Sequence, residues 1–471
     1  MSESAKQWLT LLMVGALAAV VLAPLQAMPY GRDQAAFAVG ARDGVFLPFN
    51  HSVNAKIYPP GVFGWFTAVR ALVGRMETDA RQVEWAWMLL TCLLAALVAT
   101  EWARHKAAGL VAGAVLAVAY LGRGFTGTLQ PAGLAQLFLL FALGAWGRPD
   151  RERSPRRIIA TGLALGAASL FVAGYGIAFF ALMVSESYQK QNETSKSFSS
   201  VGGRFLLLAF TMALPVLLFA VTRIYPRILT IYFLHPMVRG WLDISTAPSI
   251  ETLVFLGVIA FLLFAGYRVR RDRPEVLLLG VLCAGWYVYA GFGGDRIMTI
   301  LGPLAVGAGV AAVELLRRLK AKNLSQNVVR FAAAGLALAV LATTPWLTAA
   351  RQWRPFLDFL DGRYATEVAR YFVDGETRFH YAAVREVAGT LESRSREGDT
   401  LLVYGNEPGL YYYSGLPPGM GAGENSADWV VLTPPAEAHS KDGYRLVRRL
   451  YGYVVFQRET LVKSPQNADN D

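Results

Sequence analysis

The chain has 471 residues, of which 54% are hydrophobic and only 17% are charged, and its mean hydropathy is +0.36. So little charge in a chain of this length excludes an ordinary soluble protein, because the apolar excess must face lipid. The net charge of +11 comes from clustered Arg and Lys residues. In a membrane protein such clusters indicate cytoplasmic loops and sites for anionic lipid phosphates rather than nucleic acid.

The first apolar stretch runs from Trp8 to Met28. It is long enough to span about 30 Å of hydrocarbon as a helix. It also fits a cleavable signal peptide, with Lys6 before the apolar run and Leu25-Gln26-Ala27 as the cleavage site. We favour a retained helix, and in either case the residues that follow are expected on the external face.

Ten further apolar segments predict a polytopic α-helical membrane protein. A basic residue at the bilayer centre costs about 2.5–3.5 kcal/mol, so the clusters at 148–157, 268–273 and 317–322 mark cytoplasmic boundaries. Placing all three clusters on the cytoplasmic side requires that 157–187 forms two short helices, separated at Val172-Ala173-Gly174, instead of one span. This topology has eleven spans, a cytoplasmic N-terminus and an external C-terminus. Several are too short for a full bilayer and are expected to flank a cavity. The expected segments are 8–28, 85–101, 107–121, 129–146, 157–171, 173–187, 205–222, 250–267, 275–291, 296–315 and 330–350.

A first external loop is expected at 29–84, inside a transmembrane domain that covers 1–350. Within this loop, Val62 to Val73 follows two prolines and is apolar but too short to cross the membrane. It is typical of a helix that lies in the membrane interface.

The composition changes at about Arg351, and 351–462 is expected to form a small external α/β domain. Residues 382–395 have an amphipathic helical pattern, whereas 400–404, 429–432 and 451–456 have strand patterns. The tyrosines at 411–413 are expected to pack this domain onto the membrane helices rather than to stack on a sugar. The tail 463–471 is polar and expected to be disordered.

The order of motifs near the N-terminus is informative. Tyr30-Gly31-Arg32-Asp33-Gln34 follows the first helix, Gly44 comes some ten residues later, and Lys56-Ile57-Tyr58-Pro59-Pro60-Gly61 precedes the interfacial helix. This order resembles the C-type glycosyltransferase superfamily, specifically the branch of the protein O-mannosyltransferases and the lipid A aminoarabinose transferase. The resemblance implies a sugar donor on a polyprenyl phosphate, an external acceptor, and a first-loop aspartate as the general base.

Asp33 is therefore the predicted catalytic residue. A carboxylate at the outer membrane boundary is able to take the proton of an acceptor hydroxyl that attacks the anomeric carbon. Arg32 is expected to support it by favouring the ionised carboxylate. A helix-flanking or capping role in a solvated loop is the alternative reading of Asp33.

The leaving group would be a lipid phosphate, whose charge is met by fixed cations. Lys56 matches the position of a lysine in the resembled family, and Tyr58, Pro59 and Pro60 are predicted to shape its loop. The other candidate phosphate ligands, each with membrane snorkelling as the alternative, are Arg123, Arg239 and Arg296.

The chain also departs from the resembled family. Its relatives often carry acids shortly before the lysine, whereas this chain has Phe49-Asn50-His51-Ser52-Val53-Asn54. We therefore expect no metal and no other cofactor. Cys92 and Cys283 lie in apolar spans and are interpreted as packing residues rather than as a disulfide.

The sequence thus predicts an inverting membrane glycosyltransferase of the bacterial plasma membrane, with a lipid, glycan or protein acceptor. Two alternatives remain open. One is a lipid or solute transporter or flippase. The sequence argues against it because it does not divide into two similar halves and has few acidic residues inside its apolar segments. The other is an O-antigen ligase or polymerase that uses a diphosphate donor, although such enzymes keep their large loop late in the chain.

Overall fold

The chain folds into two structural units in the computed structural model. Unit 1 comprises Met1–Ala27, Pro59–Val62 and Thr78–Phe356, and unit 2 comprises Met28–Tyr58, Phe63–Glu77 and Leu357–Asp471. Unit 2 therefore combines the segment after the first helix with the C-terminal region. The described residues are 3–43, 59–147, 154–177, 182, 198–223, 250–268, 274–290, 296–321, 346–363, 371–374, 379–419, 427–434 and 441–459.

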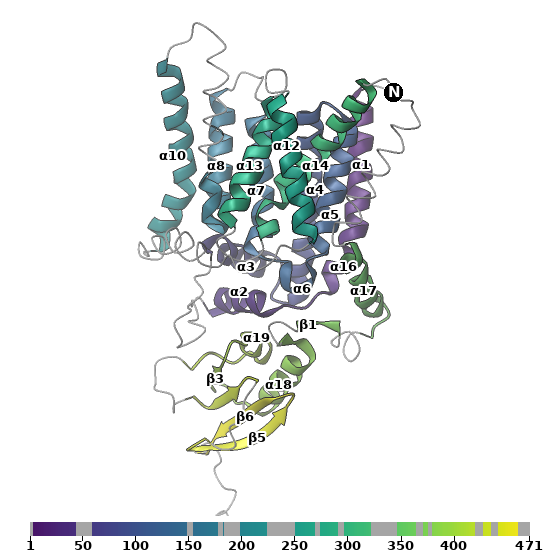
Figure 1. Cartoon of the computed structure of the whole chain (residues 1–471). Helices are drawn as coiled ribbons and strands as arrows, with labels where there is room; N and C mark the ends of the chain where they lie inside the picture. The colour runs from purple at the N-terminus through teal and green to yellow at the C-terminus, as the bar shows by residue number, and fades with distance from the viewer. Residues whose placement is uncertain are drawn as a thin grey trace, which may run out of the picture. The chain divides into compact units, whose positions relative to one another are not determined.

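Unit 1 is helical (Figure 1). Most of its long helices begin and end close to the expected apolar segments, whereas α4 and α10 begin several residues earlier. Its elements are α1 (Glu3–Leu22), η1 (Ala23–Ala27), α4 (Glu77–Ala103), α5 (Lys106–Leu121), α6 (Gly124–Gly127), α7 (Pro131–Trp146), α8 (Pro155–Phe171), η2 (Ala173–Ile177), α10 (Phe198–Arg223), α12 (Ile250–Arg268), α13 (Pro274–Ala290), α14 (Arg296–Ala321) and α16 (Trp346–Arg351). A further helix, α17 (Trp353–Leu360), crosses from unit 1 into unit 2.

Helix α14 lies at the centre of unit 1, where it packs against α5, α7, α12 and α13. Three described helices are long and apolar enough to cross a membrane, over Gln7–Ala27, Glu77–Ala103 and Met298–Lys320. Five shorter apolar helices accompany them. The predicted count of eleven spans stays a prediction, because 178–181, 183–197 and 322–345 lie outside the described residues.

The predicted break in the short helix pair is present where α8 ends at Phe171. The next residue, Val172, has an extended backbone, and its N–H donates to the carbonyl of Ala168. The 3-10 helix η2 follows, and the remainder of the expected second helix lies outside the described residues. Val172 and Gly174 favour this interruption because a β-branched residue and a glycine have lower helix propensity than most residues.

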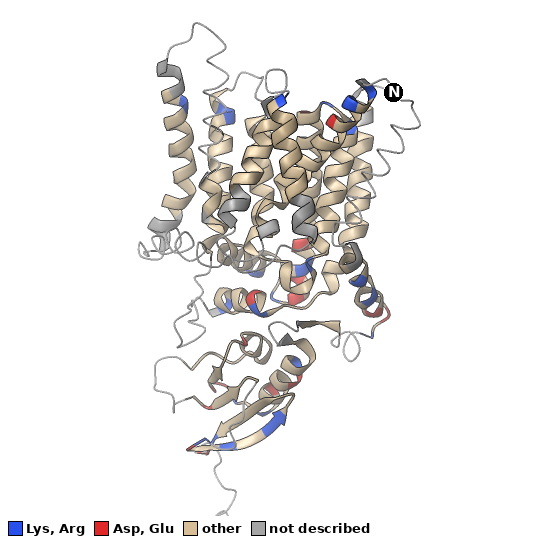
Figure 2. Cartoon of the chain, in the orientation of Figure 1, with Lys and Arg blue, Asp and Glu red and all other residues tan. Residues whose placement is uncertain are grey.

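Basic residues of unit 1 gather where α8 begins and where α12 and α14 end (Figure 2). Arg317 donates to the carbonyl of Ala103 at 2.7 Å, and Arg318 donates to the carbonyl of Ala265 at 3.4 Å. The C-terminal ends of α4, α12 and α14 therefore meet. This arrangement agrees with placing the described members of two basic clusters, Arg268 in one and Arg317 and Arg318 in the other, on one side of the membrane.

Gln136 joins α7 to α14 near Pro303, which lies inside α14. Its amide N–H groups donate to the carbonyls of Met298 (2.9 Å) and Thr299 (3.2 Å), and its carbonyl accepts the N–H of Gly302 at 2.8 Å. Pro303 has no N–H for the carbonyl four residues earlier, which belongs to Thr299. Gln136 and the Tyr175 hydroxyl, which donates to the Thr299 carbonyl at 2.6 Å, thus take the place of the N–H that proline lacks.

We expect Gln136→Leu to lower the stability of unit 1 by about 1–3 kcal/mol, because the buried N–H of Gly302 and the carbonyl of Met298 lose their bonds to Gln136. The Thr299 carbonyl keeps its bond from the Tyr175 hydroxyl. The expected readout is a lower midpoint of thermal unfolding in detergent. Gln7→Leu is the matched control, because Gln7 is exposed on α1. Equal midpoints for the two variants would show that α14 does not need Gln136 near Pro303.

Unit 2 begins with structure that the sequence did not reveal. The expected loop at 29–84 contains helix α2 (Arg32–Asp43) and helix α3 (Pro60–Leu72), and α4 begins at Glu77 rather than at 85. Hydropathy marks the apolar part of a helix, whereas the polar turns at its ends are helical as well. Helix α3 confirms the helix expected over 62–73, and its interfacial position stays a prediction.

The C-terminal part of unit 2 is the α/β region in Figure 1. The three expected strands and the expected helix are confirmed, and β1, β2 and β5 are additional. Its elements are β1 (Val373–Asp374), β2 (Phe379–His380), α18 (Tyr381–Arg394), β3 (Leu401–Tyr404), α19 (Gly409–Ser414), β4 (Trp429–Leu432), β5 (Tyr444–Leu450) and β6 (Tyr453–Arg458).

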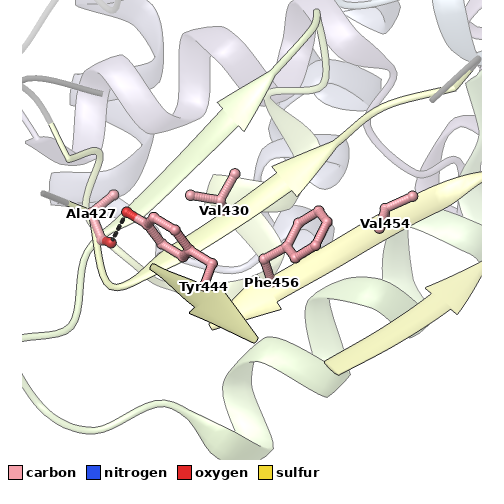
Figure 3. Packing of buried hydrophobic residues seen from close by; sticks show 5 residues of the cluster. All are labelled: Ala427, Val430, Tyr444, Val454 and Phe456. Atoms are coloured by element: carbon pink, nitrogen blue, oxygen red, sulfur yellow. Dashed lines mark hydrogen bonds between the residues drawn. The ribbon is translucent and has the colours of Figure 1, made fainter. Parts of the chain in front are cut away.

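The main sheet has the strand order β3-β4-β6-β5. Strands β3 and β4 are parallel, with Leu402 opposite Val430, and the other neighbours are antiparallel. The core on this sheet contains Val430, Val454 and Phe456, with the Tyr444 hydroxyl donating to the Ala427 carbonyl at 2.7 Å (Figure 3). Leu402 and Tyr404 of β3 pack against this core, and β3 leads directly into the residues around Glu407 described next.

Candidate active site

Asp33 lies in the first turn of α2, directly after the first apolar helix and η1. The N–H of Ala35 donates to the carbonyl of Gly31 at 3.0 Å, which starts the helix. Asp33 is half-buried. Its expected position in a loop is corrected to a helix N-terminus, where the helix dipole favours a carboxylate.

Arg32 forms an ion pair that the sequence did not predict. Its Nε donates to Glu407 Oε2 at 3.1 Å, and the Tyr453 hydroxyl donates to the same oxygen at 3.1 Å. The Glu407 side chain is fully buried, whereas Arg32 is partly exposed. The residue beside the predicted base is therefore anchored to the turn after β3.

Burial raises the pKa of Glu407 from its ordinary value to about 7. The positive charge of Arg32 and the hydrogen bonds from Arg32 and Tyr453 lower the pKa, but they do not offset the loss of water. Glu407 is therefore a carboxyl group that titrates near neutrality. It binds Arg32, which directly precedes Asp33 in the sequence.

Helix α2 is also tied to α19. Arg42 donates to the carbonyl of Tyr411 at 3.1 Å and to the carbonyl of Leu416 at 3.3 Å. At the other end of α2, the ring of Tyr30 lies 5.1 Å from that of Tyr412 between centroids. The two ends of the motif around Asp33 are thus held by the same short aromatic helix.

Glu77 completes this arrangement at the start of α4. Its Oε1 accepts the backbone N–H of Tyr30 and, at 2.8 Å, the hydroxyl of Tyr413. Burial and the charge of Glu77 raise the pKa of Tyr413 well above its ordinary value, so this hydroxyl is a stable donor. The expected tyrosine cluster therefore packs onto the segment around Asp33 within unit 2.

The predicted phosphate ligands are only partly within the described residues. Lys56, Arg239 and Tyr58 lie outside them. Pro59 is described, its carbonyl accepts the N–H of Val62 at 3.2 Å, and Pro60 begins α3. Arg123 lies in the turn between α5 and α6 as predicted, and Arg296 is the first residue of α14.

Sequence reasoning missed Glu407, Glu77 and Arg42. Glu407 lies in Gly405-Asn406-Glu407-Pro408, a turn motif that gives no local sign of a partner 375 residues away. Arg42 had a readable signal, since a basic residue in the last turn of a helix is favourable. That signal required α2 to be recognised as a helix.

No group of three or more His, Cys, Asp or Glu side chains suited to a metal ion occurs among the described residues. His51 and His235 lie outside those ranges. The expectation that no metal is required stays a prediction.

The fold is similar to that of three solved glycosyltransferase structures. ArnT from Cupriavidus metallidurans bound to undecaprenyl phosphate has 16% sequence identity and a TM-score of 0.58, over 97% of this chain and 98% of that chain. ArnT in the apo state has 16% identity and a TM-score of 0.57, over 98% and 100%. The archaeal oligosaccharyltransferase AglB from Archaeoglobus fulgidus, in complex with an inhibitory peptide and a dolichol-phosphate, has 12% identity and a TM-score of 0.54, over 92% and 70%.

This chain has the fold of the C-type glycosyltransferases. Because the likeness to ArnT covers nearly the whole of both chains, it includes the apolar helices and the C-terminal α/β region. Neither a protein-family model nor a curated protein matches the sequence. The C-type fold is that of a multi-pass membrane protein, in agreement with the apolar helices of unit 1.

Proposed function

We propose that the chain is a membrane glycosyltransferase that moves a sugar from a polyprenyl-phosphate donor to an acceptor hydroxyl on the outer face of the bacterial plasma membrane. The observation that carries this proposal is the fold shared with ArnT, which was solved with undecaprenyl phosphate. The likeness to AglB, solved with a dolichol-phosphate, supports the same donor class. The acceptor is a lipid, a glycan or a protein.

In the proposed reaction, the acceptor oxygen forms a bond to the anomeric carbon on the face opposite the phosphate. The bond between that carbon and the phosphate oxygen breaks, and the configuration at the carbon inverts. Asp33 accepts the proton of the acceptor hydroxyl as general base. Anchoring of Arg32 and Arg42 supports this role, because both hold the helix that carries Asp33.

The polyprenyl phosphate leaves with its negative charge, which fixed cations stabilise. We propose Lys56, Arg123, Arg239 and Arg296 as the residues that meet this charge. Arg123 and Arg296 both lie at helix ends of unit 1. We propose no metal for this step.

The test is transfer by the purified full-length protein with a panel of lipid-linked sugars. We expect transfer from polyprenyl-monophosphate sugars and none from the corresponding diphosphates, with inversion visible by NMR of the product linkage. Transfer only from diphosphates would favour the ligase or polymerase alternative. Movement of a solute or lipid across proteoliposomes without any transfer would favour the transporter or flippase alternative.

A further inference from the structure

One buried carboxylate binds both ends of the turn that carries Arg123. Glu84 Oε1 accepts the hydroxyl of Tyr120 at 2.6 Å and the backbone N–H of Leu129 at 2.7 Å. Tyr120 lies at the end of α5, and Leu129 lies just before α7. The N–H of Leu129 also donates to the Tyr120 hydroxyl at 2.9 Å, so the two ends are joined directly as well.

Arg81 strengthens this closure from the preceding turn of α4. Its Nη1 donates to Glu84 Oε2 at 2.7 Å and to the hydroxyl of Thr128 at 3.1 Å. The side chains of Arg81 and Glu84 are fully buried, and Thr128 is buried too. We call Arg81 and Glu84 the clasp. A buried ion pair adds little net stability compared with apolar residues, whereas its directional bonds fix the geometry of what it binds.

Helix α4 begins at Glu77, so Glu84 lies inside it. Leu129 shows that the clasp holds an unusual backbone, because its φ of +55° is rarely adopted by a residue other than glycine. Such a conformation persists only where surrounding bonds determine it.

The turn that the clasp holds between Tyr120 and Leu129 also fixes the position of Arg123. Its backbone N–H donates to the carbonyl of Tyr120 at 3.1 Å. A Cβ atom added at Gly127 would lie 2.7 Å from the Arg123 Cβ, so the base of the Arg123 side chain lies directly against the glycine. The closed turn therefore fixes both the backbone N–H and the Cβ atom of Arg123.

We propose that Arg81 and Glu84 are positioning residues that hold Arg123 for the anionic phosphate of a membrane lipid. The inference rests on the proposed function, in which Arg123 meets the donor phosphate. It adds that the ion pair in α4 acts on the phosphate only through Arg123, and that neither Arg81 nor Glu84 touches the lipid.

The test is a double-mutant cycle on the full-length protein, with binding of undecaprenyl phosphate as the readout. The clasp variant is Arg81→Met with Glu84→Leu, because replacing both members of a buried ion pair by apolar residues usually preserves folding. It is combined with Arg123→Gln. Glu314→Gln is the control, since it removes another buried carboxylate paired with arginines. Arg317, which also pairs with Glu314, contacts Ala103, roughly 28 Å along α4 from Glu84.

We expect the clasp variant and Arg123→Gln each to weaken binding by about 10- to 100-fold. The combined variant should bind no more weakly than either, because the clasp has nothing to position once Arg123 is gone. Glu314→Gln should bind as the wild type does. Wild-type affinity in a folded clasp variant would overturn the inference, as would losses that multiply in the combined variant. A wild-type protein that neither binds the lipid phosphate nor transfers a sugar would overturn the proposed function itself.

Discussion

Replacing Asp33 by Asn is expected to abolish sugar transfer while the protein stays folded and still binds undecaprenyl phosphate. The amide retains the size of the carboxylate but cannot accept the proton of the acceptor hydroxyl. General-base catalysis contributes about 10²- to 10⁴-fold, so we expect a loss of that order in the rate of a single turnover. Quenched-flow measurement of product from a preformed donor complex separates this step from binding.

The matched control is Asp358→Asn. Asp358 is also half-buried, also belongs to unit 2 and lies on α17. We expect that variant to transfer at the wild-type rate. Wild-type turnover in Asp33→Asn would contradict the assignment of Asp33 as the base, even if the enzyme class were right.

The stability of unit 2 is expected to fall as the pH rises from about 4.5 to about 7. Burial raises the pKa of Glu407 in the folded protein to about 7, from its ordinary value of 4.5. Between these values the folded state holds a proton that the unfolded chain has released, so raising the pH favours unfolding. The expected difference between pH 4.5 and pH 8 is about 3 kcal/mol from this group.

Glu407→Gln should remove this contribution, because an amide does not titrate and still accepts the bonds from Arg32 and Tyr453. Urea unfolding followed by the fluorine NMR signal of labelled Trp429, which is fully buried in β4, reports on unit 2 within the whole protein. Glu397→Gln is the control, since Glu397 is exposed. A pH dependence that is the same in Glu407→Gln and in the wild type would show that Glu407 titrates normally.

Local patterns in the sequence were sufficient for the elements whose apolar periodicity is strong. Strand β4, with the sequence Trp-Val-Val-Leu, is buried on both faces and is readable as a continuous apolar run. Strand β5 contains three arginines and was missed, because it lies at the sheet edge, where charged side chains are tolerated and protect against pairing with another chain. Helix α2 was missed because it is polar enough to resemble a loop.

The candidate site was predictable only in part, for a physical reason. Asp33 was identified from the order of motifs around it, all within a short stretch of chain. Its supports are not local: Arg32 pairs with Glu407, and Arg42 binds the carbonyls at Tyr411 and Leu416. Such contacts depend on how distant segments pack, and no spacing in the sequence records them. The clasp at Arg81 and Glu84 was hidden because the apolar part of α4 begins after it.

The central claim is that Asp33 acts as the general base in the transfer of a sugar from a lipid phosphate at the outer membrane boundary. The most direct test is an electron cryo-microscopy structure of the full-length protein in a lipid nanodisc with a non-reactive analogue of a polyprenyl-phosphate sugar. We predict that the Asp33 carboxylate faces the anomeric carbon across a gap that one acceptor hydroxyl fills, with the phosphate held by basic side chains. A headgroup bound elsewhere, or an Asp33 carboxylate on the cytoplasmic side, would contradict the assignment.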